Sequence, residues 1–307
     1  MAALSSRAVS GPSSTRGLFL IALAAVSWGT TGTATTFLVR DTALSPLVIG
    51  VARLALAALV LAVLARRQGP LAIARADVMP SIAMGACMAV FQAGYFSAVI
   101  LVGVALTALI AICSAPLIIA LLAWLTLGER LSARGAVALG IGVTGTALLI
   151  TGSRGLASAD GSRFAAGIAL ALAAGAGYAM YVVIAKRSLA RSAPLPLAAF
   201  TFAAGTVWLA PALLFTDTSA AQLAGGWPLL LYLGVVTTGL AYAAYTTGLT
   251  GTSAAGAGIV ALLEPLTATL LGVALFGERF GAFGVLGAVL LLGAVGLLVR
   301  EEARAGR

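Results

Sequence analysis

The segment PLIIALLAWLTLGER (residues 116–130) has a counterpart, PLTATLLGVALFGER (residues 265–279), which lies 149 residues further along the chain. In both copies a proline stands 13 residues before a glutamate that sits between glycine and arginine. The chain is therefore predicted to contain two copies of one unit. Because nearly everything in each copy is apolar, the unit is a membrane repeat. Duplicated membrane units build the central binding site of many secondary transporters, so solute transport is the leading interpretation.

Composition limits the class of protein. Mean hydropathy is +1.11, and 61% of residues are hydrophobic while 9% are charged. Ordinary soluble domains do not reach these values. A membrane-spanning helix needs about 20 apolar residues. About ten such runs are present, near residues 18–39, 44–65, 78–100, 104–127, 132–151, 164–185, 195–215, 228–249, 254–276 and 280–299.

These runs predict an all-α integral membrane protein with about ten transmembrane helices. A transmembrane β-barrel is excluded, because its strands would alternate in polarity over about ten residues. The observed runs are continuous and about twice that length.

The basic residues predict the topology. With the N-terminus placed inside, thirteen of the 18 basic residues fall in inner segments, four fall in outer loops, and Arg53 lies within a span. The positive-inside rule then predicts a multi-pass protein of the cytoplasmic (inner) membrane with both termini cytoplasmic. This distribution accounts for the formal charge of +9, so no nucleic-acid partner is predicted; the partners expected are the lipid bilayer and a small-molecule substrate.

The domain organisation follows from the spans. Residues 1–17 are a predicted disordered cytoplasmic tail, rich in small residues. Residues 18–151 form the first repeat, 152–163 a flexible linker, 164–299 the second repeat and 300–307 a cytoplasmic tail. Linkers this short leave no room for a nucleotide-binding domain. No cofactor is predicted.

Five helices per copy is an odd number, so the second repeat is predicted to enter the membrane upside down relative to the first. Glu129 would then face the cytoplasm and Glu278 the outside. Inverted repeats place their substrate site near the bilayer midplane, between the halves.

Several motifs carry a resemblance to a known family. They are Ser27-Trp28-Gly29 in the first span, Arg53 in the second, and the paired endings that run from Pro116 to Glu129 and from Pro265 to Glu278. Together the chain resembles the drug/metabolite transporter superfamily in its ten-helix form with two EamA-type domains. The resemblance implies export of amino acids or related metabolites, as in aromatic amino acid exporters of the YddG kind. Other branches carry sugars or nucleotide sugars, so the substrate stays open.

Two ionisable residues lie deep in predicted spans, Arg53 in the second and Glu264 in the ninth. A charge at that depth costs roughly 3 kcal/mol on insertion scales unless it faces a partner or a wet cavity. Arg53 is a candidate to hold a substrate carboxylate. Glu264 is a candidate ammonium partner or proton-coupling site. The alternative is that the two residues pair with each other or with helix ends and only hold the bundle together.

Pro116 and Pro265 occupy matching mid-span positions in the two repeats. Each proline is expected to disturb its helix and to loosen the carbonyl four residues earlier. This disturbance would serve gating or would form a static kink. Ser114, two residues before Pro116, is expected to satisfy loosened backbone or to face the cavity.

Aromatic and polar side chains near mid-span predict a cavity wall. Interface belts would place aromatic residues at span ends instead. Tyrosine and tryptophan offer ring surface plus one polar atom, which suits an amphipathic solute. The candidates are Trp28, Phe91, Gln92, Tyr95, Tyr178, Tyr181, Thr238, Tyr242 and Tyr245.

The remaining features concern packing and other classes of protein. Glycines in the fifth and tenth spans predict close helix packing or a homodimer face, although a monomer suffices for the mechanism. The chain has no histidine, and its two cysteines fall mid-span, so no metal site is predicted.

Two other classes of protein are less favoured than a transporter. An intramembrane lipid-modifying enzyme would need clustered acidic or histidine side chains. A passive channel would need a continuous polar stripe.

Overall fold

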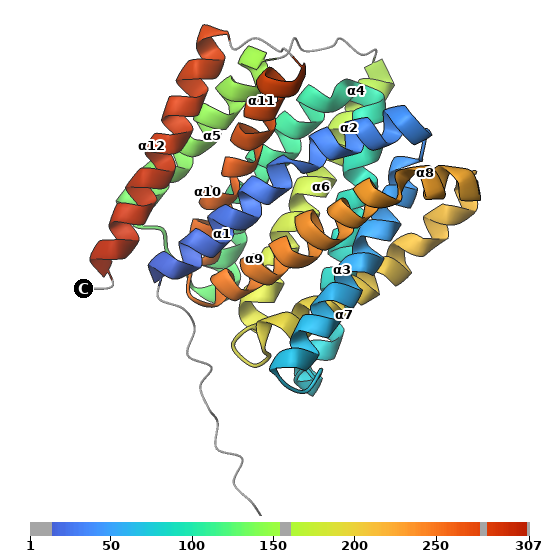
Figure 1. Cartoon of the computed structure of the whole chain (residues 1–307). Coiled ribbons are helices and arrows are strands. Elements are labelled where there is room, and N and C mark those ends of the chain that lie inside the picture. The colour runs from blue at the N-terminus through green and yellow to red at the C-terminus, as the bar shows by residue number, and fades with distance from the viewer. Residues whose placement is uncertain (1–13, 154–160, 277–280, 306–307) are drawn as a thin grey trace, which may run out of the picture.

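The computed structural model describes residues 14–153, 161–276 and 281–305. Within these ranges the chain is helical, with turns and short connections between the helices. The described residues contain ten candidate membrane spans, which confirms the predicted all-α membrane fold (Figure 1). Glu278 and Arg279 of the second repeat motif lie outside the described residues.

The first repeat comprises five spans. The helices are α1 (Ser14–Gly29), α2 (Thr31–Thr42), α3 (Pro46–Gln68), the short 3-10 helix η1 (Arg75–Asp77), α4 (Val78–Leu127) and α5 (Ala133–Ser153). Helices α1 and α2 together make one span. Helix α4 makes two spans, because Gly103 has a φ of 81° and a ψ of 164° and turns the chain back between them. A positive φ of this size favours glycine, which lacks a Cβ.

The second repeat also comprises five spans, three of them interrupted. The helices are α6 (Gly161–Ser188), α7 (Pro194–Leu209), η2 (Ala210–Phe215), α8 (Ala220–Leu231), η3 (Tyr232–Leu240), α9 (Ala241–Thr250), α10 (Ala254–Ala261), α11 (Leu263–Phe276) and α12 (Ala282–Ala305). Of these, η2 is a 3-10 helix that ends the α7 span, and η3 is a π-helical segment between α8 and α9.

Side-chain caps set several helix starts. Helix α8 begins eight residues before the predicted start at 228, because Ser219 and Gln222 form a capping box. The Ser219 hydroxyl accepts from the Gln222 N–H at 3.2 Å, and the Gln222 amide oxygen accepts from the Ser219 N–H at 2.8 Å. Such a reciprocal pair satisfies two backbone donors that a helix start otherwise leaves open.

The first predicted helix is not continuous, because it breaks between α1 and α2 at Thr30. Gly29, the last residue of α1, lies against α11. A Cβ built on Gly29 would stand 2.6 Å from the Glu264 carbonyl oxygen. Only glycine permits so close an approach, and the break thus lies beside a predicted site residue.

The matching prolines behave differently. Pro116 lies inside the second span of α4, where the helix continues past the proline. Pro265 lies in the first turn of α11, just after the break between α10 and α11. Proline is tolerated in a first helical turn because those N–H groups have no intrahelical partner. The helix therefore breaks at Ala261, four residues before Pro265, whereas no break accompanies Pro116.

Helix seams hold the bundle together, and helices α5 and α12 run side by side (Figure 1). At this seam a Cβ on Gly145 would stand 2.8 Å from the Gly287 carbonyl oxygen. Gly145 and Gly287 therefore pack against each other inside the chain, in agreement with the close helix packing predicted for these two spans.

Candidate functional site

An aromatic cluster lies at the centre of the bundle, around Trp28 at the end of α1. The Trp28 ring lies 4.9 Å from Tyr242 and 5.1 Å from Tyr245, both of α9. It meets Tyr178 of α6 edge-on at 6.2 Å. The structure therefore brings together four predicted site residues from both repeats. Contacts at these centroid distances are typical of favourable aromatic pairs.

Further rings extend this aromatic cluster through α4, α6 and α7. Tyr181 lies 5.8 Å from Tyr242, and Phe91 lies 5.9 Å from both Tyr178 and Tyr95. Phe202 lies 4.6 Å from Tyr242 and is fully buried. Sequence reasoning missed Phe202, because a phenylalanine in a helix that is apolar on every side does not stand out.

Several polar atoms beside the cluster are buried without a partner. The Trp28 indole N–H, the Ser27 hydroxyl and the Thr31 hydroxyl make no hydrogen bond with another described residue. Trp28 itself is 6% exposed. A buried indole N–H nearly always finds an acceptor. Three open polar groups within one helical turn therefore indicate a place where a solute or water supplies the missing partners.

Arg53 of α3 reaches the π-helical segment η3. Its Nε donates to the Thr238 hydroxyl at 3.2 Å, and that hydroxyl donates in turn to the Leu233 carbonyl at 2.7 Å. Leu233 stands five residues before Thr238, which matches the π-helical register. Single π-helical turns frequently occur at functional sites. Here the wider turn orients a buried hydroxyl toward Arg53, which lies within a span.

Arg53 and Glu264 do not form the direct pair that one interpretation of the sequence expects. They attract each other electrostatically, but the described residues contain no Arg53–Glu264 contact within the 4.0 Å range of an ion pair. The Arg53 terminal nitrogens and the Glu264 carboxylate also make no hydrogen bond with a described residue. Both side chains keep part of their surface accessible. Two opposite charges thus stand near each other with their hydrogen-bonding groups available.

Gln92 and Ser114, both on α4, differ in where they lie. The Gln92 amide nitrogen would be 3.4 Å from a Cβ on Gly50, which is one helical turn before Arg53 on α3. Gln92 therefore packs against α3 about one turn away from Arg53. The Ser114 hydroxyl donates to the Ala111 carbonyl at 3.3 Å and packs against Gly175 of α6. Ser114 thus satisfies helix backbone in the α4–α6 seam.

The site is closed toward the end of the bundle where α1 begins and α12 ends (Figure 1). On that side of the cluster, Leu18, Ile21, Tyr181 and Leu249 are at most 2% exposed. On the opposite side Thr30, Thr31 and Tyr95 keep accessible surface. The side chains between the cluster and the end near the termini are therefore packed tightly.

A buried carboxylate ties the two repeats together at this closed end. Asp77, at the start of α4, is fully buried and pairs with Arg191 from the α6–α7 connection. The Ser192 hydroxyl donates to the second Asp77 oxygen at 2.7 Å and accepts from the Ala74 N–H at 3.0 Å. Sequence reasoning missed this cluster, because its members are more than 110 residues apart.

Two further contacts hold the turn between α9 and α10 at the same end. The Lys186 ammonium donates to the Leu249 carbonyl at 2.8 Å and to the Thr252 carbonyl at 2.6 Å. The Glu129 carboxylate accepts from the Ala254 N–H at 2.9 Å. The glutamate of the first repeat motif therefore caps the first helix of a span in the second repeat.

A ten-span bundle whose two halves enclose a polar and aromatic interior site defines the class of protein as a membrane transporter. The chain belongs to the EamA-like transporter family, whose model matches it twice, over residues 15–151 and 165–300. The two matches confirm the duplication and the family resemblance found in the sequence.

Relatives with known sequences agree with this assignment. The chain is 35% identical over 289 residues to the uncharacterized transporter YwfM of Bacillus subtilis (strain 168), covering 93% of each chain. It is 27% identical to the uncharacterized inner membrane transporter YicL of Salmonella typhimurium (strain LT2), covering 96% of this chain and 99% of the relative. A solved crystal structure with 21% identity aligns with a TM-score of 0.80 over 94% of this chain and 98% of the other, which shows a shared fold.

Proposed function

We propose that the protein is a secondary transporter that exports small amphipathic metabolites, foremost amino acids with an aromatic or other apolar side chain. Transport proceeds by alternating access at the site between Trp28, Arg53 and Glu264. The observation that carries the proposal is that Arg53 and Glu264, two opposite charges inside the spans, form no ion pair with each other and have hydrogen-bonding groups available beside the aromatic cluster.

A zwitterion matches this arrangement. Charges inside a membrane protein are costly unless they find partners. An amino acid carries a carboxylate for the Arg53 guanidinium and an ammonium for the Glu264 carboxylate. Its side chain then packs on the rings of Trp28 and Tyr242, which lie 4.9 Å apart. The open Trp28 N–H offers one further donor to the substrate carboxylate.

Other substrate classes fit less well. A nucleotide sugar carries two phosphates, whose binding commonly uses several cationic groups. Among the described residues, Arg53 is the single cation that lies within the middle of a span beside the cluster. An uncharged sugar would leave both Arg53 and Glu264 without a charged partner. The opposite signs at the site therefore favour a zwitterion over either class.

The proposal also covers the membrane location, the oligomeric state and the role of Glu264. The protein resides in the cytoplasmic (inner) membrane with both termini cytoplasmic, as the distribution of basic residues supports. One chain contains both halves of the site, so a monomer suffices. No enzymatic activity is proposed. Glu264 either holds the substrate ammonium or exchanges a proton during transport.

Reconstitution into liposomes with a panel of labelled amino acids tests the proposal. We expect counterflow of L-phenylalanine, L-tyrosine or L-leucine, and much weaker counterflow of L-aspartate and L-lysine. Tyr242→Ala should weaken this transport while the amount of folded protein is unchanged. Absence of counterflow for every amino acid in the panel, with counterflow of a sugar or nucleotide instead, would reject the proposal.

A further inference from the structure

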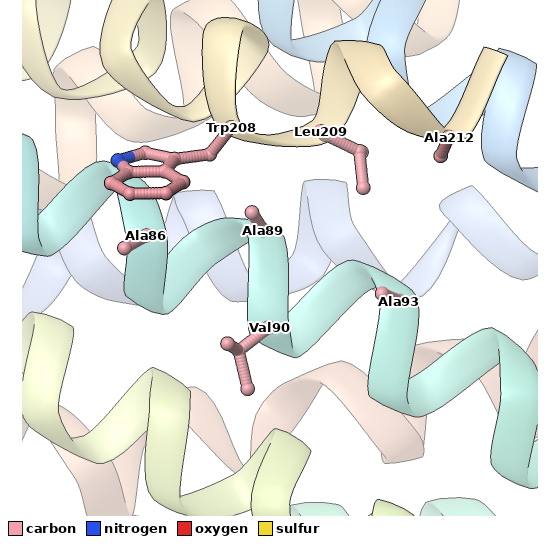
Figure 2. A pocket seen from close by; sticks show the side chains of 7 residues that line it. All are labelled: Ala86, Ala89, Val90, Ala93, Trp208, Leu209 and Ala212. Carbon is pink, nitrogen blue, oxygen red and sulfur yellow. The ribbon is translucent and has the colours of Figure 1, made fainter. Parts of the chain in front are cut away.

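An apolar groove runs along the outer seam between α4 and α7. It consists of two pockets, which we call the mid-span pocket, of about 400 Å³, and the end pocket, of about 530 Å³. Figure 2 shows the mid-span pocket, in which alanines of α4 face the Trp208 side of α7. Alanine side chains leave space between two helices that larger residues would fill.

The two pockets lie along one face of the seam. The α4 residues that line them, from Val78 through Ile82, Ala86 and Ala89 to Ala93, are spaced by three or four positions and so share one helix face. Helices α4 and α7 are in close contact at Gly85, where a Cβ would stand 2.6 Å from the Gly205 backbone nitrogen.

This face is directed at the lipid. Along the groove Val207 is 74% exposed and Trp208 is 55% exposed. Exposed apolar side chains of this size on a membrane bundle face acyl chains, because no water is present at that depth. The two pockets therefore offer apolar surface to a lipid tail.

The end pocket is next to basic residues. Leu71 and Ile73 line this pocket. Arg67, in the last turn of α3, stands four residues before Leu71, and Arg75 stands two residues after Ile73. Arg66, Arg67 and Arg75 are exposed and make no ion pair or hydrogen bond with any residue that the structure describes.

The nearest carboxylate does not neutralise these arginines. Asp77 is fully buried and is already engaged by Arg191 and Ser192. Positive charge therefore remains at the end of the groove, at the depth where the positive-inside prediction places the cytoplasmic headgroups. Basic clusters at this level attract anionic lipids.

We propose that the α4/α7 groove is a binding site for an anionic phospholipid. One acyl chain lies along the alanines of α4, and the headgroup phosphate lies against Arg66, Arg67 and Arg75. This site is separate from the aromatic cluster and does not depend on the identity of the transported solute.

The test compares two lipids with the same acyl chains, the anionic dioleoyl phosphatidylglycerol and the zwitterionic dioleoyl phosphatidylcholine. Each is added to the full-length protein in detergent, and binding is followed by native mass spectrometry and by the melting temperature. Each basic residue near a lipid surface contributes about fivefold in affinity. For three arginines we therefore expect a preference for phosphatidylglycerol on the order of 100-fold.

Changes in the groove and at the arginines separate the two parts of the site. Ala203 is exposed and lines the end pocket, so Ala203→Phe should fill the groove without a clash in the core. We expect this variant to lose tight lipid binding. Ala173→Phe, at an exposed position of α6 outside the groove, is the matched control and should bind phosphatidylglycerol normally.

Substitution of Arg66, Arg67 and Arg75 by glutamine should abolish the preference for phosphatidylglycerol but leave weak binding of both lipids. The same substitution at Arg130 and Arg134, which are exposed elsewhere on that end, should have little effect. Equal binding of both lipids by the unaltered protein would overturn the proposal. A preference for phosphatidylglycerol that survives Ala203→Phe would also overturn it. So would a dimer that Ala203→Phe dissociates, because a second copy of the chain, and not a lipid, would then fill the groove.

Discussion

Replacement of Thr238 by valine tests the role of Arg53 without removing its charge. The Thr238 hydroxyl is the acceptor for Arg53 Nε at 3.2 Å and donates to the Leu233 carbonyl at 2.7 Å. Valine keeps the volume and the branch but offers no acceptor. The guanidinium then loses the contact that orients it toward the interior. If Arg53 holds the substrate carboxylate, substrate affinity should fall.

The size of the effect follows from measured hydrogen bonds between membrane helices. These contribute about 0.6 kcal/mol on average and about 1.7 kcal/mol at most. At 25 °C this range corresponds to an affinity loss of about 3- to 18-fold. We expect KM for L-phenylalanine counterflow to rise within this range, while kcat and the melting temperature change little.

The neighbouring Thr237 is the matched control. Its hydroxyl also donates to the Leu233 carbonyl, at 2.9 Å, and it is fully buried, but it does not contact Arg53. Thr237→Val should leave KM unchanged, and Thr238→Ser should restore most of the affinity because it keeps the hydroxyl. An unchanged KM in Thr238→Val, or an equal rise in Thr237→Val, would refute the assignment of Arg53 to the substrate.

Three other predictions concern coupling, stability and topology. If Glu264 couples protons, Glu264→Gln should abolish accumulation driven by a pH gradient and leave counterflow measurable; pH-driven uptake that persists would exclude this role. Asp77→Asn should lower the free energy of unfolding by about 1.5–3 kcal/mol, because hydrogen bonds to a charged group are lost; an unchanged melting temperature would contradict this. Single cysteines at Arg130 and Asp217, in a cysteine-free background, should be labelled from opposite sides of the membrane, and labelling of both from one side would reject the topology.

The sequence predicted the number of spans and the duplication, because about ten long apolar runs and a repeated Gly-Glu-Arg ending leave little ambiguity. It also singled out Trp28, Tyr178, Tyr242 and Tyr245, which the structure brings together. Aromatic residues in the middle of a span are conspicuous against small aliphatic neighbours. Their roles in transport stay predictions.

Other features could not be predicted from the sequence. The π-helical segment η3 depends on the register of backbone hydrogen bonds, which the pattern of apolar residues does not report. The pairing of Asp77 with Arg191 joins residues 114 positions apart, and the sequence alone does not match charges over such separations. The break before Thr30 depends on the approach of α11 to Gly29.

The central claim is that Arg53 and Glu264 together recognise a zwitterion beside the aromatic cluster. Counterflow in liposomes measures this most directly, with labelled L-phenylalanine inside and three unlabelled competitors offered separately outside. These are L-phenylalanine, phenethylamine, which lacks the carboxylate, and 3-phenylpropanoate, which lacks the ammonium. We predict exchange with L-phenylalanine and little exchange with either analogue. Exchange of the amine or the acid as fast as that of the amino acid would contradict the claim.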